Sequence, residues 1–348
     1  MSKKVTVSLL TYNGARYLPY CLPSLFSQTF SDWQLVICDN GSSDDSVAVV
    51  SELTQGRENV VLLAAAPHNI GFAAGHNKII KQTDSDYVLL LNQDILLAPD
   101  YLEKLVLFLD KNPSAAAVSG LFLHWDFNNV QTEGKGKKDI IDSAGLRAHR
   151  SCQVSEWGAR PPSHAKRVGQ AGESTDGRYA KTHEVFGVSG ALPLLRRRAL
   201  VAAGFFDERF FSYKEDVDLA FRLQSAGWQS FCVGEARAWH DRGLAGGGTA
   251  ALSVAKNRAK KSAIGNYLSY RNHWFILIKD VALRDWLCYG IVILWYELQK
   301  AVYLLLFEPK TLLAWREIFQ SLPALLQERK KIKPKSIKKW LWTSHLSS

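Results

Sequence analysis

Two clusters of polar and acidic side chains contain the residues best suited to chemistry. The first follows an apolar run, Tyr87–Leu91, which breaks at Asn92, Gln93 and Asp94. An uncharged run that stops at polar residues is typical of a buried strand. Ligands of open α/β sheets bind beyond the carboxyl ends of the strands, and a divalent cation held there by Asp94 would neutralise a diphosphate leaving group. The alternative is that Asn92 and Asp94 cap a helix beginning near Pro99.

The second cluster consists of Glu215, Asp216 and Asp218, which directly follow an aromatic segment, residues 205–213. Carboxylates packed beside Phe and Tyr lose hydration, and this raises their pKa toward the range that a general base needs. The alternative is that these acids open a helix running to Ala226, where they suit the helix dipole. That alternative explains Asp218, one turn inside the helix, but not the adjacent pair. We therefore expect a functional role for at least one of Glu215 and Asp216.

The elements that position the first cluster follow a regular pattern. From their β-branched and aliphatic content, strands are expected at residues 5–10, 33–38, 60–63 and 87–91. Polar segments follow the first three at Thr11–Gly14, Asp39–Asp45 and His68–Asn77, and helices are expected at 17–28 and 101–111, with a further strand at 115–122. Repeated strand, loop and helix units predict a parallel sheet with helices on both faces. The polar loops would then share one edge of the sheet.

The second half of the chain is less regular. Residues 125–184 are rich in Gly, Lys, Ser and Asp, so we expect a loop-dominated insertion with one strand at 139–143. Beyond it we expect an ordered segment at 185–191, a helix at 197–203 and a strand at 230–233. His240 follows, and a lone histidine is more commonly an ordinary polar residue than a ligand. The glycine-rich stretch 243–248 is suited to folding over a bound ligand.

The C-terminal region changes character. Residues 281–296 and 301–307 are strongly apolar and are flanked by Trp and Tyr. Glu297, Gln299 and Lys300 separate them, so no uncharged run reaches the roughly 20 residues that span a bilayer. This pattern predicts a pair of amphipathic helices that lie in a membrane interface.

A basic tail follows the apolar segments. Residues 329–339 hold seven Lys or Arg among eleven residues, and Trp340 and Trp342 come soon after. Each cation near an anionic bilayer contributes about 1 kcal/mol to binding. A nucleic-acid patch or a solvated tail would show the same charge, but interfacial Trp beside apolar helices favours an anionic membrane surface.

Composition limits the compartment and the class of partner. The chain has 348 residues and a formal net charge of +10, which indicates anionic partners without identifying them. Its five cysteines show no paired spacing, so the sequence predicts neither a zinc site nor a disulfide framework. The apolar start of the chain is interrupted at Thr11–Gly14, before it reaches the length of a signal peptide. We expect a cytoplasmic protein.

The order of the motifs resembles that of a known family. The matching segments are Thr11–Asn13, Ser24–Leu25 with Gln28–Thr29, Asp39–Ser42 with Asp44, Asn69–Asn77, Leu91–Asp94, Ser189–Ala191, Gly204–Glu208 and Tyr213–Leu219. In this order, over about residues 5 to 245, they resemble a family 2 glycosyltransferase of the bacterial rhamnosyltransferase-like group, which builds cell-surface polysaccharides. Each motif alone is weak, whereas the ordered set is specific.

The resemblance implies a fold and a division of the chain. The fold is the α/β GT-A type of nucleotide-diphospho-sugar transferases, with a mixed, mostly parallel central sheet, flanking helices and added C-terminal amphipathic helices. Residues 1–250 would form the glycosyltransferase domain, with a nucleotide-sugar-binding half at 1–124 and an acceptor-binding half at 185–250. Residues 251–348 would form a helical, membrane-associating region.

The resemblance also implies roles for individual residues. Asp216 matches the catalytic base, and Glu215 is the next candidate. The residues matched to the nucleotide-sugar site are Thr11, Tyr12, Asn13 and Asp39 for the base and ribose, and Asn40, Gly71, Phe72, Asn77 and Asn92 for the rest of the donor. Asp94 and His240 match metal-site residues. Asn92 replaces the first acid of the metal motif, which leaves strict dependence on Mg²⁺ or Mn²⁺ open.

The expected activity follows from these assignments. We expect an inverting glycosyltransferase that moves a sugar, with L-rhamnose from dTDP-L-rhamnose as first choice, onto a lipid-linked oligosaccharide or polysaccharide. It would be peripheral on the inner face of the cell membrane, with oligomers possible through the C-terminal helices. One alternative is a catalytically silent relative that binds nucleotide or glycan and scaffolds polysaccharide assembly. Nucleic-acid binding is supported by charge alone, since no nucleic-acid module is visible.

Overall fold

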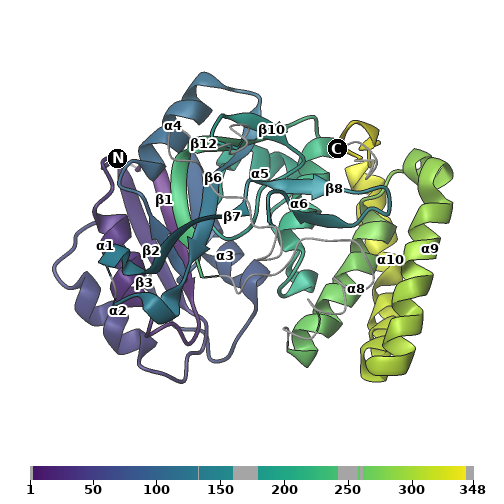
Figure 1. Cartoon of the computed structure of the whole chain (residues 1–348), viewed down its shortest axis with the longest axis horizontal. Coiled ribbons are helices and arrows are strands. Elements are labelled where there is room, and N and C mark those ends of the chain that lie inside the picture. Colours follow the sequence, from purple (N-terminus) through teal and green to yellow (C-terminus); the bar gives the residue numbers. More distant parts are fainter. Residues whose placement is uncertain (1–2, 132, 160–178, 242–257, 259–261, 342–348) are drawn as a thin grey trace.

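A mixed β-sheet forms the centre of the molecule (Figure 1). The computed structural model describes residues 3–131, 133–159, 179–241, 258 and 262–341. The strand order in the sheet is β10-β12-β6-β11-β4-β1-β2-β3, with β5 paired to β12 and β7 paired to β6. The strands are β1 (Val5–Thr11), β2 (Trp33–Asp39), β3 (Val60–Leu63), β4 (Tyr87–Leu91), β5 (Ile95–Leu97), β6 (Ala115–Trp125), β7 (Lys137–Ser143), β10 (His183–Val185), β11 (Leu194–Arg196) and β12 (Gln229–His240), and β8 (Leu146–Ala148) pairs separately with β9 (Val154–Glu156).

The first half contains the predicted repeating units. Strand β1 is parallel to β2 and β4, and β2 is parallel to β3. The connecting helices are α1 (Leu18–Phe26), α2 (Ser46–Thr54), α3 (Phe72–Lys81) and α4 (Tyr101–Lys111). Strand β11 then inserts antiparallel between β4 and β6, and β12 returns parallel to β6. The predicted mixed sheet with flanking helices is therefore confirmed.

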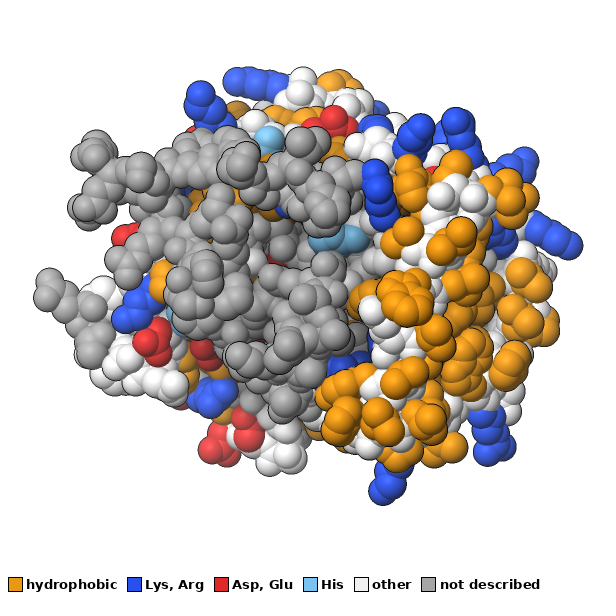
Figure 2. All heavy atoms as spheres, turned by 45° about the vertical axis from the view of Figure 1, so that its right-hand side comes forward, with side chains coloured by type: hydrophobic (Ala, Val, Ile, Leu, Met, Phe, Trp, Pro, Cys, Tyr) orange, Lys and Arg blue, Asp and Glu red, His pale blue; other side chains and the backbone are white. Residues whose placement is uncertain are grey.

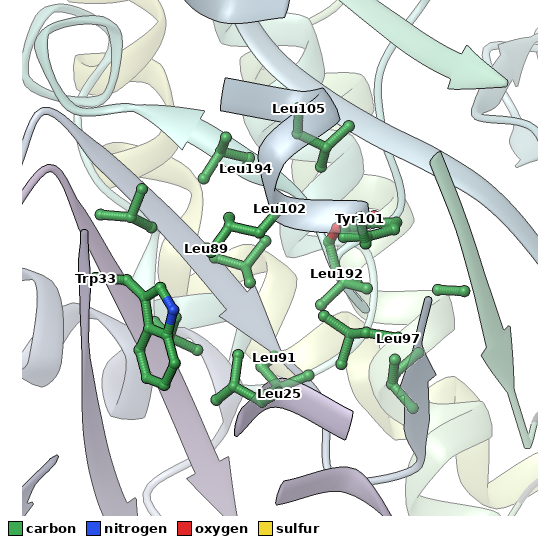
Figure 3. Close-up of a cluster of buried hydrophobic side chains, with 14 of the residues drawn as sticks. Leu25, Trp33, Leu89, Leu91, Leu97, Tyr101, Leu102, Leu105, Leu192 and Leu194 are labelled. Atoms are coloured by element: carbon green, nitrogen blue, oxygen red, sulfur yellow. Dashed lines mark hydrogen bonds between the residues drawn. The ribbon is translucent and has the colours of Figure 1, made fainter. Parts of the chain in front are cut away.

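The packing around β4 explains why this strand ends at a fixed place. Leu89 and Leu91 of β4 are fully buried, and Figure 3 shows them among leucines of neighbouring elements. The Tyr101 hydroxyl donates to the Leu192 carbonyl at 2.9 Å and accepts the Gly120 N–H at 2.9 Å. Each buried aliphatic side chain contributes about 1.5–3 kcal/mol. The polar loop beyond β4 thus starts from a rigid base.

The remaining helices follow β11 in the chain. Helices α5 (Arg197–Ala203) and α6 (Glu215–Ser225) precede β12, and the short 3-10 turn η4 (Glu208–Phe210) lies between them. Helices α8 (Ala263–Lys279), α9 (Leu283–Phe307) and α10 (Ala314–Ile332) form the layer on the right of Figure 1. Short 3-10 turns complete the chain at η1 (Phe127–Asn129), η2 (Glu133–Gly136), η5 (Pro309–Leu313) and η6 (Lys338–Trp340).

The proposal that Asn92 and Asp94 cap the helix near Pro99 is wrong. Strand β5 lies between Asp94 and α4, and the N-cap residue of α4 is Asp100. Three apolar residues are a short signal in the sequence, and β5 forms only because β12 pairs with it from far along the chain. The carboxylate of Asp94 is thereby separated from the helix.

The expected loop-dominated insertion contains more strand than predicted. Strands β7 to β10 lie in its described part, and the strand expected at 230–233 runs on to His240 as β12. The register shift between Val233 and Arg237 accommodates Gly234, a residue that weakens a strand signal in the sequence. Of the ordered segment expected at 185–191, Val185 ends β10, and residues 186–191 lie between β10 and β11. The stretch 243–248 lies outside the described residues.

The expected pair of C-terminal apolar helices is wrong, because α9 is one continuous helix. Glu297 does not interrupt it, since its carboxylate lies 3.0 Å from His273 Nε2 of α8 and 2.7 Å from Lys300 Nζ. All three side chains are at most 9% exposed. Pairing offsets the desolvation that buried charges would otherwise suffer, so polar residues persist on the inner face of α9.

Candidate active site

The polar loops after β1 and β2 meet at one edge of the sheet, as predicted. Thr11 is opposite Asp39 in the register of the two strands. The Asp39 carboxylate accepts the N–H groups of Gly41 and Ser42 at 3.1 and 3.0 Å, and the Ser42 hydroxyl at 2.5 Å. Asp39 therefore shapes the turn in which it lies.

Two asparagines join neighbouring loops. Asn13, in a left-handed conformation with φ of 48°, accepts the Ser43 N–H at 2.8 Å. Asn40 is buried, accepts the Ile70 N–H at 2.9 Å and donates to the Asn69 side chain at 3.0 Å. The loops after β1, β2 and β3 are thus bound to one another by residues that the sequence assigned to nucleotide-sugar binding.

Gln93 is a residue of this edge that sequence reasoning missed. Its Oε1 accepts the Thr11 hydroxyl at 2.8 Å and the Tyr12 N–H at 3.1 Å, and its Nε2 donates to the Tyr12 carbonyl at 3.0 Å. A Cβ atom on Gly14 would lie 2.0 Å from Gln93 Oε1. Gln93 therefore clamps the loop after β4 to the loop after β1, while Tyr12 stays 44% exposed.

The loop that begins α3 approaches the aromatic segment of the second half. Gly71 has φ of +87°, and a Cβ atom there would lie 2.6 Å from the Phe211 carbonyl oxygen. That carbonyl accepts the Ala73 N–H at 3.2 Å. The Phe72 ring lies edge-on to the Phe206 ring, with centroids 6.1 Å apart. A side chain at position 71 would separate these segments.

Asp94, His240 and Asp142 form a row. The paired strands β5 and β12 place His240 opposite Ile95, and His240 Nε2 lies 3.5 Å from the Asp94 carboxylate. On the other side, Nδ1 lies 2.9 Å from the carboxylate of Asp142, a buried residue of β7. Since Asp142 accepts the Nδ1 proton, Nε2 is the nitrogen that faces Asp94. Sequence reasoning missed Asp142 because it treated this part of the chain as an insertion.

The donor set of this row fits a divalent cation only in part. A carboxylate oxygen and an imidazole nitrogen are both common ligands, and the Asp94 side chain is 27% exposed. Within the described part of the chain, no group of three or more His, Cys, Asp or Glu side chains is arranged around a common point. A cation at Asp94 and His240 would therefore need further ligands from a substrate or from water.

Asp216 lies in the first turn of α6 beside a small cavity that Gly190, Phe206 and Leu219 also line. Its Oδ2 accepts the Gly190 N–H at 3.0 Å, and its Oδ1 accepts the Val217 N–H at 2.7 Å. The two backbone donors hold the carboxylate in one orientation.

The two acidic clusters of the sequence meet across residues 190 and 191. The Asn92 N–H donates to the Ala191 carbonyl at 3.0 Å, while the Gly190 N–H binds Asp216. A Cβ atom on Gly190 would lie 3.4 Å from the Asp216 Cβ and 3.6 Å from Phe72. The loop of Asp94, the start of α3 and the start of α6 therefore surround one short segment.

Comparison with known families identifies this arrangement. The profile described as Glycosyl transferase family 2 matches residues 6–200, and that described as Glycosyl transferase family group 2 matches residues 174–325. The chain belongs to glycosyl transferase family 2. It is a glycosyltransferase of the rhamnosyltransferase-like group that its motifs resemble.

This glycosyltransferase is similar to proteins that are named rhamnosyltransferases. The N-acetylglucosaminyl-diphospho-decaprenol L-rhamnosyltransferase of Mycobacterium tuberculosis is 28% identical over 253 residues, which cover 70% of this chain and 77% of the relative. The O-antigen chain rhamnosyltransferase RfbN of Salmonella typhimurium is 29% identical over 146 residues, which cover 40% of this chain and 45% of the relative.

Solved structures show the same fold. The structure of GalNAc-T7 with UDP, GalNAc and Mn²⁺ has a TM-score of 0.63 at 14% identity and covers 97% of this chain and 56% of that chain. The mannosyltransferase PcManGT from Pyrobaculum calidifontis, in complex with GDP-Man and Mn²⁺, has a TM-score of 0.52 at 17% identity, with 93% and 76% covered. The expected GT-A type fold is thereby confirmed.

In this glycosyltransferase the neighbours Glu215 and Asp216 have different surroundings. Glu215 is 7% exposed, and among the described residues its Oε2 atom has no hydrogen-bond partner. Burial, and next the charge of Asp216, raise the pKa of Glu215 to about 8. Glu215 therefore favours the neutral form at pH 7, whereas Asp216 is the acid that reaches Gly190.

The side chains of Asp218 and Asn77 bind other parts of the protein. Asp218 is fully buried and pairs with Arg222 at 2.6 Å and with Lys279 of α8. The Asn77 amide donates to the Phe206 carbonyl at 2.8 Å and to Glu208 at 2.9 Å, and its oxygen accepts the Phe206 N–H at 3.1 Å. Asn77 thus fixes the start of the aromatic segment from within α3.

Proposed function

We propose that this glycosyltransferase acts with inversion on a nucleotide-sugar, with dTDP-L-rhamnose as donor and a lipid-linked oligosaccharide or polysaccharide as acceptor, in cell-surface glycan synthesis. The names of the mycobacterial and Salmonella relatives support rhamnose as the sugar, and the name of the mycobacterial relative supports a lipid-linked acceptor. The observation that carries the proposal is the junction at Gly190 and Ala191, which joins the Asp94 loop to Asp216.

Inversion needs a carboxylate at the acceptor hydroxyl. Asp216 takes the proton of this hydroxyl as its oxygen attacks the anomeric carbon and the nucleoside diphosphate departs from the opposite face. The Gly190 and Val217 N–H groups keep the carboxylate aimed during the attack. The aromatic rings of Phe72 and Phe206 limit water near the donor, which would otherwise be hydrolysed.

The loops at the sheet edge hold the donor. Tyr12 offers an exposed ring to the nucleotide, and Thr11, Asn13 and Asp39 set the shape of the base and ribose site. Asn40, Gly71, Phe72, Asn77 and Asn92 shape the rest of the donor site. The side chains of Thr11, Asn13 and Asn40 bond neighbouring loops to each other, so this part of the site is formed before the donor binds. Preorganisation of this kind reduces the entropy lost on binding.

Asp94 and His240 would together hold a divalent cation, Mg²⁺ or Mn²⁺, with further ligands from the substrate or from water. When bound, it supplies positive charge to the leaving diphosphate. Asp142 fixes the ring of His240 so that Nε2 faces Asp94. The Mn²⁺ named with both solved structures supports this assignment, although Asn92 stands where the family's motif has an acid.

The test is a panel of nucleotide-sugars, with release of nucleoside diphosphate as the readout. Turnover is expected with dTDP-L-rhamnose, and Asp216→Asn should abolish most of it. Turnover with a different donor would change the proposed sugar and leave the proposed mechanism unchanged. Absence of turnover with every donor, in a protein that still binds nucleotide, would support the silent scaffold instead.

The C-terminal helices suit a membrane surface. By length and composition, helix α9 is long and apolar enough to cross a membrane, and 22% of its most apolar 18-residue stretch is buried. Its exposed apolar stripe recurs at intervals of three or four residues and consists of Leu283, Leu287, Ile291, Leu294, Leu298, Val302 and Leu305. Figure 2 shows this face as a continuous apolar surface with Lys and Arg at its margins.

The inner face of α9 supports the proposal that the helix lies on the membrane instead of crossing it. Glu297 and Lys300 are paired with each other, and Glu297 also pairs with His273 of α8, so this face is fixed to the rest of the protein. The exposed apolar side chains of α9, including the stripe, remain available to lipid. With the basic residues 329–339 near anionic headgroups, the protein would sit peripherally on the inner face of the cell membrane, in the cytoplasm.

Liposome sedimentation tests this placement. Ile291 is 87% exposed, and Ile291→Glu should reduce binding to anionic liposomes, whereas Val201→Glu, at a residue 62% exposed on α5, should not. Retention should fall only partly at 1 M salt, where the screening length is about 3 Å. Equal binding of both variants would contradict the proposal. If the protein forms a dimer that Ile291→Glu dissociates, the stripe binds a second copy of the chain. If the protein binds nucleic acid tightly and does not bind liposomes, the basic residues serve nucleic-acid binding.

A further inference from the structure

The turn before Asp216 has an unusual backbone. Phe211, Tyr213 and Lys214 all have positive φ, at 61°, 70° and 69°. The Ser212 N–H donates to the Phe210 carbonyl at 2.6 Å, which closes a tight turn centred on Phe211. Residues other than glycine rarely adopt these conformations, and they persist only where surrounding structure holds them.

Asn272 of α8 supplies part of that hold. It is fully buried, and its Nδ2 donates to the carbonyls of Phe210, Ser212 and Tyr213 at 2.9, 2.9 and 2.7 Å. These three carbonyls span the turn. A buried amide that faces three carbonyls of one short segment fixes the course of that segment.

Arg271 completes the hold from the adjacent position. Its Nη2 donates to the Arg209 carbonyl at 2.8 Å and to the Phe210 carbonyl at 3.2 Å, and its Nε donates to Asn272 Oδ1 at 3.0 Å. Its Nη1 pairs with Glu317 of α10 at 2.6 Å. Asn272 is therefore oriented by Arg271, which is itself fixed by α10.

The held turn contacts both parts of the proposed site. The Phe211 carbonyl accepts the Ala73 N–H at the start of α3, and Lys214 is the residue from which α6 begins. Asp216 lies two residues further on. A shift of this turn would therefore move the carboxylate relative to Gly190.

We propose that Asn272 and Arg271 are positioning residues for the transfer reaction, which hold residues 209–214 and thereby aim Asp216. The inference rests on the proposed role of Asp216 as the base. It assigns to α8 an indirect part in the reaction, through the turn that precedes Asp216.

The test compares Asn272→Ala with Asn266→Ala. Asn266 lies on the same helix, is also buried, and donates to the Arg258 carbonyl instead of the turn. Asn272→Ala should lower kcat by about 10- to 100-fold with little change in nucleotide affinity, because a misplacement of about 1 Å in a catalytic group has effects of this order. Asn266→Ala should keep kcat within about 2-fold, at a similar loss of melting temperature.

Two further measurements make every outcome decisive. Amide hydrogen exchange of the peptide 209–217 should accelerate in Asn272→Ala and not in Asn266→Ala, which tests the hold on the turn without relying on turnover. Arg271→Lys, which keeps the charge but loses the planar fork, should show the same pattern more weakly and serves if Asn272→Ala does not fold. Unchanged exchange, or an unchanged kcat in an enzyme that Asp216→Asn inactivates, would overturn the inference. If the turn loosens but Asp216→Asn retains wild-type turnover, the role of Asp216 fails and the hold on the turn stands.

Discussion

The donor side and the acceptor side of the proposed site are held in different ways. On the donor side, the loops after β1, β2, β3 and β4 bind each other through their own side chains, such as Asn13, Asn40 and Gln93. On the acceptor side, the turn before Asp216 has strained backbone and is held by Asn272 and Arg271 of α8.

This difference separates binding from chemistry. On our proposal, the loops that bind one another form the nucleotide site without a contribution from the C-terminal helices. The catalytic turn depends on a helix that begins some fifty residues later in the chain and that packs against α10. Damage to the donor side should therefore appear in affinity, and damage to α8 should appear in turnover.

The largest effect is expected at Asp216. Asp216→Asn preserves the shape of the side chain but removes the base, so kcat should fall by a factor on the order of 100 or more. Nucleotide affinity, measured by calorimetry, should stay near that of wild type. Turnover close to that of wild type would make Glu215 the candidate base. The turn before Asp216 would then lose its proposed link to catalysis.

Asp94 should affect the donor side next most strongly. If a cation links this carboxylate to the diphosphate, Asp94→Ala should weaken nucleotide binding by about 10-fold or more and remove any response to Mn²⁺ or Mg²⁺. Calorimetry with metal and with chelator measures both effects. Equal affinity of wild type under the two conditions would show that Asn92, in place of an acid, has removed the requirement.

The sequence predicted the strands and loops of the first half well because its signals there are local. Each strand from β1 to β4 is a compact apolar run, and each polar loop follows its own strand, so position along the chain indicated position at the sheet edge. The junction of the two acidic clusters was not visible, since Asn92 and Ala191 meet only after β11 inserts beside β4.

The missed residues depend on partners distant in sequence. Asp142 becomes significant only when β7 and β12 bring it to His240, and Asn272 only when α8 meets the turn at 210–213. The continuity of α9 was missed for a similar reason. Glu297 indicates a break in the apolar pattern, and its pairing with His273 and Lys300 removes that break in the folded chain.

A smaller effect on the donor side is expected from Gln93. Gln93→Ala removes three hydrogen bonds between the loops of β1 and β4, in a partly exposed position, and should weaken nucleotide binding by about 5-fold. The turnover number should hardly change, opposite to the pattern of Asn272→Ala. The control is Gln34→Ala, which removes a hydrogen bond from β2 to Thr6 of β1. A loss of kcat in Gln93→Ala would show that the two sides are coupled.

The smallest effect on turnover is expected from Glu215, whose role is in stability. Its pKa is raised from 4.5 to about 8 in the folded protein, so between these values the folded state binds more protons than the unfolded state. The contribution of Glu215 to stability is therefore complete below about pH 4.5 and is lost as the pH rises toward 8. Glu215→Gln keeps the neutral shape and cannot ionise. Relative to wild type, its free energy of unfolding should rise by at least about 1 kcal/mol between pH 5 and pH 8.5.

Denaturant unfolding at the two pH values measures this difference, with Glu58→Gln at an exposed acid as the control that should show none. At pH 7 the kcat of Glu215→Gln should stay near that of wild type, because Asp216 and not Glu215 reaches Gly190. A large loss of kcat would make Glu215 the base. A pH-independent difference in stability would instead mean that water reaches this carboxyl in the folded protein, so that burial does not hold it neutral and the turn is less closely packed than α8 makes it.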